Sequence, residues 1–240
     1  MTAGLAGTLL ILAVQSPTVV TPASPRLQPS CAPAAVDTFE LVLLAPGQPE
    51  RVVATLRRTW APSREGGAQV CVLEQHYSRS GSSDLDSSIV NAGTLAPVRY
   101  WAQVDQEIQR FRFSADSATG TVQAGDSTPR VVAEGAPSPY FLGVADLEVL
   151  RALPLAAGFH ARFMSYNPPR GFHDVEVQVE GVDSIAVGGK TTAAWRLGYQ
   201  AGGAPTVLWL RRDNGALLRS KSVLRNGAVF WRRRLGDVVG

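Results

Sequence analysis

Between residues 51 and 235 the sequence repeatedly alternates apolar and polar side chains, one residue at a time. In the segment 69–77, Cys71, Leu73 and Tyr77 would share one face of an extended chain. The same alternation recurs in 98–104, 108–113, 120–124, 159–166, 174–181, 184–187 and 191–199. Because a period of two matches a strand whose two faces differ in environment, the chain is predicted to be mainly β.

The C-terminal part gives the clearest hairpin signals. Three further alternating segments, 205–211, 216–224 and 228–235, are separated by Asp213-Asn214-Gly215 and by Asn226-Gly227. Asn-Gly readily adopts the positive φ angles that a tight hairpin turn requires. These segments are therefore predicted to form an antiparallel meander.

Helix is scarce in this sequence. Only 144–153 has helical spacing, with Leu147, Leu150 and Leu153 on one side and Pro154 as the stop. Strand-like segments without a βαβ rhythm favour one curved antiparallel sheet, a half-barrel or barrel-like meander, with one short helix. The predicted β domain spans 46–236, and 79–88 is expected as an exposed loop or a short edge strand.

The N-terminal 25 residues contain no charged side chain, and 5–14 form an apolar run of ten. Ten residues span about 15 Å as a helix, roughly half of a bilayer core. The run fits a secretory signal peptide over 1–25 with a small-residue cleavage site at Thr21-Pro22-Ala23, although it has no Lys or Arg before it. Export to the periplasm or cell envelope follows as an expectation, with 26–45 as a linker.

The chain has two cysteines, Cys31 and Cys71. In an exported protein an even number of cysteines favours a disulfide, and closing a loop of about 40 residues would stabilise the fold by roughly 3–4 kcal/mol. The alternative is two unrelated thiols. Two cysteines this far apart with no neighbouring His do not suggest a metal site.

The usual signatures of catalysis are missing. His76, His160 and His173 have no spacing that presents two imidazoles to one metal, and no GxSxG nucleophile elbow is present. Asp84 and Asp86 are interpreted as solvated charge or, at most, a weak cation site. The sequence therefore predicts a non-enzymatic protein without a cofactor or metal, with a hydrolase built from dispersed His and Asp as a lesser alternative.

Positive charge is concentrated near the C-terminus. Residues 201–240 carry eight basic and two acidic side chains, whereas the first 200 residues carry 15 basic and 18 acidic ones. A basic stripe on the final hairpins could contact an anionic membrane surface or an acidic protein partner, or it could be a solvated face that discourages aggregation. Export argues against nucleic acid. The candidate contact residues are Arg211, Arg219, Lys221, Arg232 and Arg234.

Aromatic residues recur in the predicted strands. In a filled sheet they would form the core, whereas in a half-open barrel they would line a cavity for an acyl chain or another hydrophobic ligand. The candidate wall residues are Trp101, Phe163, Trp195 and Trp209.

Four segments together resemble a known family. They are Ala92-Gly-Thr-Leu-Ala-Pro-Val-Arg99, Leu150-Arg-Ala-Leu-Pro-Leu-Ala-Ala-Gly158, Val187-Gly-Gly-Lys-Thr-Thr-Ala-Ala-Trp195 and Val207-Leu-Trp-Leu-Arg-Arg-Asp-Asn-Gly-Ala-Leu-Leu-Arg219. In their order and spacing they resemble the bacterial exported proteins called domain of unknown function 3108. The resemblance implies an exported, mainly antiparallel β protein with a curved sheet similar to the periplasmic lipoprotein-carrier scaffolds. The family has no established catalytic residues.

Two hypotheses follow. The first is an exported β protein that binds or carries a hydrophobic or lipidic ligand. The second is an interaction module that docks on a protein partner through its basic C-terminal meander.

Overall fold

The computed structural model describes residues 16–31, 35–168 and 170–235 of the chain. Its one α-helix, α1 (Asp146–Ala152), follows a short 3-10 turn at Gly143–Ala145. The strands are β1 (Thr18–Val19), β2 (Ala35–Leu44), β3 (Arg51–Glu65), β4 (Ala68–Arg79), β5 (Ser82–Asn91), β6 (Pro97–Val104), β7 (Glu107–Phe113), β8 (Ser117–Ala124), β9 (Arg130–Gly135), β10 (Tyr140–Leu142), β11 (His160–Asn167), β12 (Gly171–Val187), β13 (Lys190–Gln200), β14 (Thr206–Arg211), β15 (Leu217–Val223) and β16 (Val229–Arg234).

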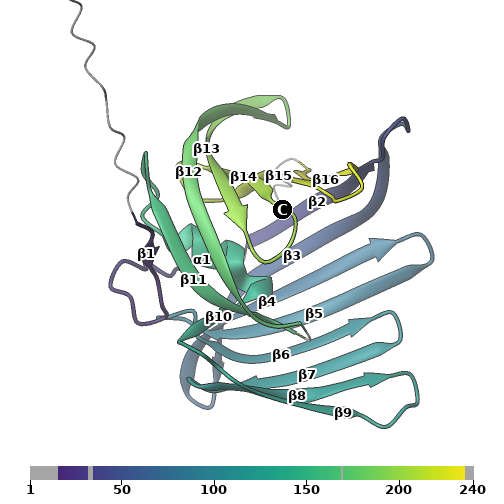
Figure 1. Cartoon of the computed structure of the whole chain (residues 1–240), viewed down its shortest axis with the longest axis vertical. Helices are drawn as coiled ribbons and strands as arrows, with labels where there is room; N and C mark the ends of the chain where they lie inside the picture. Colours follow the sequence, from purple (N-terminus) through teal and green to yellow (C-terminus); the bar gives the residue numbers. More distant parts are fainter. Residues whose placement is uncertain (1–15, 32–34, 169, 236–240) are drawn as a thin grey trace, which may run out of the picture.

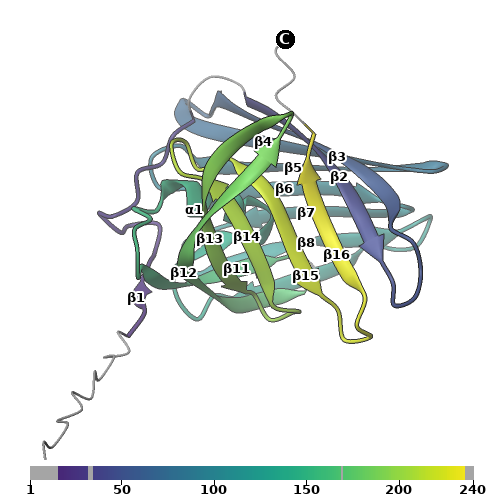
Figure 2. The ribbon, with the colours of Figure 1, turned by 90° about the horizontal axis from the view of Figure 1, so that it is seen from above.

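All these strands belong to one sheet that does not close on itself. Its order is β1-β11-β12-β13-β14-β15-β16-β2-β3-β4-β5-β6-β7-β8-β9, with β10 paired to β11. Every pair along this path is antiparallel except β1 with β11, and the β10–β11 pair is parallel too. The sheet curves back over itself (Figure 1), so that in the view of Figure 2 β12–β16 lie in front of β4–β8 and cross them steeply. The predicted single curved antiparallel sheet with one short helix is confirmed.

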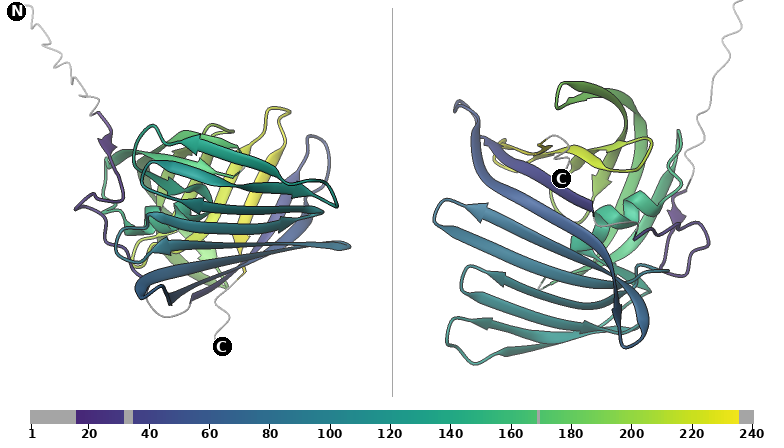
Figure 3. Two further views of the ribbon diagram at one scale, coloured as in Figure 1. Left: turned by 90° about the horizontal axis from the view of Figure 1, so that it is seen from below. Right: turned by 180° about the vertical axis from the view of Figure 1, so that it is seen from behind.

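The inner face of this curve carries the main core. Phe39 of β2, Leu56 of β3 and Leu73 of β4 are completely buried there, as are Val149 and Leu150 of α1. The helix lies within the curve of the sheet (Figures 1 and 3). Because alternate residues of each strand point inward, the sequence period of two translates directly into this core.

Part of the interior is filled by aromatic rings. The aromatic cluster consists of Phe111, Phe113, Tyr140, Tyr166 and Phe172, whose contacting ring centroids lie 4.7–6.4 Å apart. Tilted and edge-to-face pairs of this kind add to the stabilisation from burial. A Cβ on Gly120 of β8 would overlap the Arg110 carbonyl oxygen of β7 and lie 2.7 Å from the Phe111 ring, so the close approach of β7 requires glycine at that position.

The N-terminal segment is tied to the sheet. Cys31 and Cys71 form a disulfide with their Cα atoms 5.9 Å apart, which is the pairing that the sequence suggested. Trp60 Nε1 donates a hydrogen bond to the Ser30 carbonyl at 3.1 Å. Of the predicted signal peptide, residues 1–15 lie outside the described residues, whereas β1 pairs with β11 and Val20 is buried in the core.

Two expectations about organisation are corrected. The interval 26–45, expected as a linker, contains β2, a strand between β16 and β3 with Phe39 and Val42 fully buried. The interval 79–88, expected as an exposed loop or edge strand, contains most of β5, which lies between β4 and β6. Polar residues on the inner face of β5 conceal its strand pattern, since Asp84, Asp86 and Ser88 are buried. The predicted segments 174–181 and 184–187 are one strand, β12, with an irregularity between Val179 and Gly181.

In the described part of the chain, no helix has the length and apolar character needed to cross a membrane.

Candidate functional site

An interior cavity of about 380 Å³ lies on the inner face of the sheet, next to α1. It is bounded by residues from β3, β4, β11, β13, β14, β15, β16, α1 and the 3-10 turn before the helix. The lining side chains are Arg58, Gln75, Tyr77, Val144, Asp146, Leu147, Leu150, Asn167, Tyr199, Thr206, Leu208, Ser220, Ser222, Phe230 and Arg232, together with Gly143. Cavities of this volume are large enough for a small-molecule ligand.

Arg232 on β16 is the cation that most distinguishes this cavity. It pairs in register with Ser220 on one side and with buried Leu41 on the other, and its neighbours Trp231 and Arg233 lie on the opposite face. Its Nε is buried and has no hydrogen-bond partner among the described residues. Its guanidinium carbon lies 5.9 Å from the centroid of the Phe39 ring. Burial lowers the pKa of Arg232, Tyr77 opposes this, and the nearby Arg58 lowers it further.

A second polar group connects Arg58, Gln75 and Asp86 across β3, β4 and β5. Arg58 Nε donates to Gln75 Oε1 at 3.0 Å, and Gln75 Nε2 donates to both Asp86 oxygens at 3.2 and 3.3 Å. Burial raises the pKa of Asp86 to about 7, against the hydrogen bond from Gln75 and the charge of Arg58. This carboxyl therefore changes its protonation near neutral pH.

Asp146, the first residue of α1, forms a third polar group. It accepts hydrogen bonds from the Tyr199 hydroxyl at 2.6 Å and from the Ser165 hydroxyl at 2.9 Å. Burial raises its pKa to about 7 although both hydrogen bonds favour the ionised form. These bonds attach the start of the helix to β11 and β13.

The far end of α1 is held by a buried ion-pair network. Glu148 accepts from Arg151 at 2.9 and 3.2 Å and lies 3.2 Å from Arg58. Asp37 of β2 binds Arg151 and Arg234, each at 2.7 Å. Burial acts to raise the pKa of Asp37, but Arg151 and the other arginines outweigh it and hold that pKa below its usual range.

The rest of the cavity lining is apolar. Leu147 and Leu150 come from α1, Leu208 from β14 and Phe230 from β16. On the strands the apolar and polar residues are neighbours, since Leu208 pairs in register with Ser220 and Phe230 with Ser222. The cavity thus combines guanidinium, amide and hydroxyl groups with aliphatic and aromatic carbon. Such a surface is complementary to an amphiphilic molecule.

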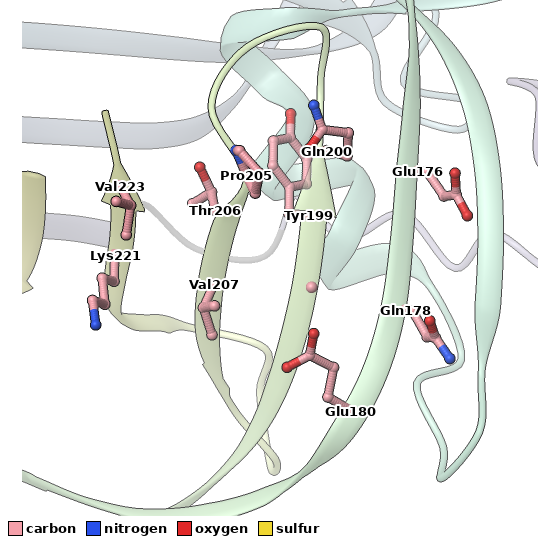
Figure 4. A pocket seen from close by; sticks show the side chains of 11 residues that line it. Glu176, Gln178, Glu180, Tyr199, Gln200, Pro205, Thr206, Val207, Lys221 and Val223 are labelled. Carbon is pink, nitrogen blue, oxygen red and sulfur yellow. The ribbon is translucent and has the colours of Figure 1, made fainter. Parts of the chain in front are cut away.

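A shallow groove crosses the outer face of the same region (Figure 4). Its lining residues are Glu176, Gln178, Glu180, Gly198, Tyr199, Gln200, Pro205, Thr206, Val207, Lys221 and Val223. Tyr199 and Thr206 also line the interior cavity, so the two hollows are adjacent at this point of β13 and β14. Gly198 leaves room for Glu180, because a Cβ there would meet its carboxylate oxygen.

The four predicted wall residues are dispersed. Trp101 lies on the outer face of β6, where it borders a hollow of about 620 Å³ with Arg99, Arg110 and Arg112. Trp209 packs on the outer face against Trp231 and donates to Asp183 Oδ2 at 2.7 Å. These placements correct the expectation that both tryptophans line the interior, since their neighbours in sequence occupy the inner face.

The other two predicted wall residues belong to the interior. Phe163 is fully buried against Phe141, with ring centroids 5.5 Å apart. Trp195 packs against the main core and lies under the Arg212 guanidinium at 4.4 Å. Neither is among the residues that line the interior cavity.

The predicted basic stripe is divided between two faces. Arg219 and Lys221 lie on the outer face beside Trp231, and Arg211 pairs with Asp213. Arg232 and Arg234 point inward, one to the cavity and the other to Asp37. Alternation along β16 separates residues of one sequence cluster, so no single stripe of all five residues exists.

The histidines do not meet. His76 is exposed on β4, whereas His160 and His173 occupy positions near opposite ends of the β11–β12 ladder. His160 pairs with Glu176 at 2.6 Å. Within the described ranges, no three His, Cys, Asp or Glu side chains are grouped as metal ligands.

Most polar residues of the cavity were missed by sequence reasoning. Arg58, Gln75 and Tyr77 come from strands whose apolar positions dominated the pattern. One signal was available: polar residues at positions that alternate in phase with core residues, as Gln75 does between Leu73 and Tyr77. A polar side chain in phase with a buried face indicates a polar interior.

Residues 53–230 match the sequence profile of the family described as Protein of unknown function (DUF3108). The chain belongs to this family. The family resemblance drawn from the sequence is therefore confirmed over most of the chain, and the interior cavity lies on elements within the matched range except for Arg232 at its edge. No protein of curated function matches the chain.

Proposed function

We propose that this member of the DUF3108 family is a non-enzymatic, exported binding protein that holds an amphiphilic, lipid-like ligand in its interior cavity. The observation that carries the proposal is the lining of the cavity of about 380 Å³, which combines guanidinium, amide and hydroxyl groups with aliphatic and aromatic side chains. That volume suits a short amphiphile or the head-proximal part of a longer one.

The disulfide supports the exported location. Disulfides form and persist in oxidising compartments such as the periplasm, and Cys31–Cys71 closes a loop with a sequence separation of 40. The apolar run at 5–14 supports the same location as the core of a signal peptide.

Native mass spectrometry on protein exported from a bacterial host, purified without detergent, tests the binding proposal. We expect a discrete added mass that fragments as an amphiphile. In Leu147→Trp the larger ring fills the cavity from α1, and the added mass should disappear. Val131→Trp is the matched control, because Val131 is 75% exposed on β9. An apo mass for the wild type, or equal ligand occupancy in Leu147→Trp, would contradict the proposal.

A second candidate function is docking of an acidic protein partner or an anionic membrane through the outer face of β14–β16. The stacked rings of Trp209 and Trp231 lie there under Arg219, whose guanidinium carbon is 4.2 Å from the Trp209 ring centroid. Trp209 is buried beneath the partly exposed Trp231 and Arg219. Tryptophan and arginine are the residue types typical of binding hot spots. Salt-sensitive recovery of one partner that is lost in Arg219→Ser, with no ligand in the cavity, would favour this function.

A further inference from the structure

We infer that the ligand of the interior cavity carries an anionic head group, a carboxylate or a phosphate, and that Arg232 binds it. This inference rests on the proposed function and names the ligand class. It begins with a charge imbalance inside the sheet.

The other interior charges that could serve as partners are already engaged. Glu148 binds Arg58 and Arg151, and Asp37 binds Arg151 and Arg234. Among the described residues, no carboxylate oxygen lies within ion-pair distance of Arg232. The ion-pair network at the far end of α1 thus holds three arginines and two carboxylates before Arg232 is added. Asp146, the other acidic residue of the cavity lining, accepts hydrogen bonds from Tyr199 and Ser165.

The groups nearest to Arg232 cannot replace a carboxylate. Burial raises the pKa of Tyr77, and burial with the charge of Asp146 raises that of Tyr199, so both phenols are neutral near pH 7. An arginine keeps its charge at any physiological pH. A buried guanidinium without a counter-charge is strongly unfavourable, which makes an anion from outside the chain the natural partner.

The surroundings of Arg232 suit an oxyanion. Ser220, directly across the ladder from Arg232, and Tyr77 both line the cavity with hydroxyl groups. Thr206 and Ser222 add two more hydroxyls, which lie 2.7 Å apart. Guanidinium and hydroxyl donors converging on one cavity wall are the usual means of binding carboxylate or phosphate oxygens.

The helix sets the orientation of the ligand. Leu147 and Leu150 of α1 offer carbon surface rather than donors to the cavity. An alkyl chain attached to the anionic head would therefore extend toward the helix. The expected ligand class is a carboxylate or phosphate amphiphile such as a fatty acid or an alkyl phosphate.

Titration calorimetry on ligand-stripped protein tests this inference with four probes: decanoate, decyl phosphate, decanol and inorganic phosphate. The variants are Arg232→Met and, as a control, Arg233→Met, whose side chain lies next along β16 on the outer face and binds Glu50 at 2.7 Å. Loss of one charge-assisted contact should weaken decanoate and decyl phosphate by about 10- to 100-fold in Arg232→Met. Arg233→Met should bind like the wild type, and Arg232→Lys should recover part of the affinity.

The four probes distinguish a failure of the anionic head group from a failure of the proposed binding function. If decanol binds as tightly as decanoate and Arg232→Met changes neither, the anionic head group is overturned while the cavity function stands. If inorganic phosphate binds through Arg232 as well as decyl phosphate does, the anion site stands and the amphiphile is overturned. If no probe binds, both are overturned.

A measurement without ligand gives an independent check. Removing an unpaired buried charge should leave the unfolding midpoint of Arg232→Met equal to or above that of the stripped wild type. A clear fall in the midpoint would show that Arg232 is neutralised by the protein itself, and it would overturn the inference.

Discussion

The aromatic cluster and the interior cavity lie on the same inner face of one sheet, yet they are built from opposite materials. In the aromatic cluster the rings contact one another. Gly120, opposite Phe111, has no room for a Cβ. Around the cavity, arginine, carboxyl and hydroxyl groups stand beside carbon, and Arg232 Nε has no hydrogen-bond partner among the described residues.

The difference shows where stability and function reside. Close-packed rings stabilise the fold through burial and dispersion, and nothing else is required of them. Buried polar groups with incomplete pairing reduce stability, so their presence indicates a role outside folding. The following predictions test this division, beginning with the largest effect.

Phe111→Ala should lower the free energy of unfolding by about 4 kcal/mol, because it removes a buried ring from the aromatic cluster and leaves a void. Ligand binding at the cavity should be unchanged under conditions where the variant is folded. Denaturant unfolding measures the first effect. The variant Trp101→Ala on the neighbouring strand, with its side chain on the outer face, should lose much less. If Phe111→Ala lowers the free energy of unfolding by less than about 1 kcal/mol, the aromatic cluster is not a stabilising part of the core.

Glu148→Gln should lower the free energy of unfolding by about 3 kcal/mol, since Arg58 and Arg151 lose their shared buried counter-charge. The helix end would be released from β2 and β3. Chemical denaturation compares this variant with Glu50→Gln, which removes an exposed partner of Arg233 and should leave stability unchanged. Equal effects of the two variants would refute the importance of the network.

Trp209→Ala should lower the free energy of unfolding by about 2 kcal/mol through loss of its stacking on Trp231 and its bond to Asp183. Because Trp209 lies on the outer face, binding of an amphiphile in the cavity should not change. Thermal unfolding and calorimetry on the same sample separate the two quantities. Weaker ligand binding with an unchanged free energy of unfolding would show that Trp209 contacts the ligand in the cavity.

Asp86→Asn should flatten the pH dependence of stability by roughly 2 kcal/mol or more between pH 5 and pH 8. The folded-state pKa of Asp86 is raised to about 7 by burial from a model value of 3.8, so the folded protein holds this proton more tightly than the unfolded chain does. Its contribution to stability is complete below about pH 4 and is lost as the pH rises through 7. Asp37 has a lowered pKa, so its contribution to stability changes with pH in the opposite direction. This contribution is the same in the wild type and in Asp86→Asn, so it cancels when the two pH dependences are subtracted.

Unfolding free energies at the two pH values, measured for both proteins, decide this prediction. An equal pH dependence in the wild type and in Asp86→Asn would mean that Asp86 is ionised in the fold throughout this range.

Much of the fold could be predicted from the sequence because alternation and turn chemistry are local. The Asn226-Gly227 turn between β15 and β16 and the helix ending before Pro154 needed no knowledge of distant residues. The strands β2 and β5 were missed for different reasons. β2 follows a proline-rich segment, and β5 presents Asp84, Asp86 and Ser88 to the interior, where apolar residues were expected.

The candidate site was less accessible to sequence reasoning, because it depends on which strands face each other. Arg232 and Arg219 belong to one basic cluster in the sequence. Because side chains alternate between the two faces of β16 and β15, Arg232 points into the cavity and Arg219 lies on the outer face. Likewise, Arg232 has no carboxylate partner among the described residues because the nearby carboxylates Glu148 and Asp37 pair with other arginines. Such pairing is set by tertiary structure and has no local signature.

The most direct test is a crystal structure of the protein, produced in a bacterial host with its N-terminal segment and purified without detergent and without added ligand. We predict continuous density in the interior cavity, with an oxyanion in contact with the Arg232 guanidinium and a chain running toward Leu147 and Leu150. A cavity holding only ordered water, with a water molecule on Arg232 Nε, would contradict it.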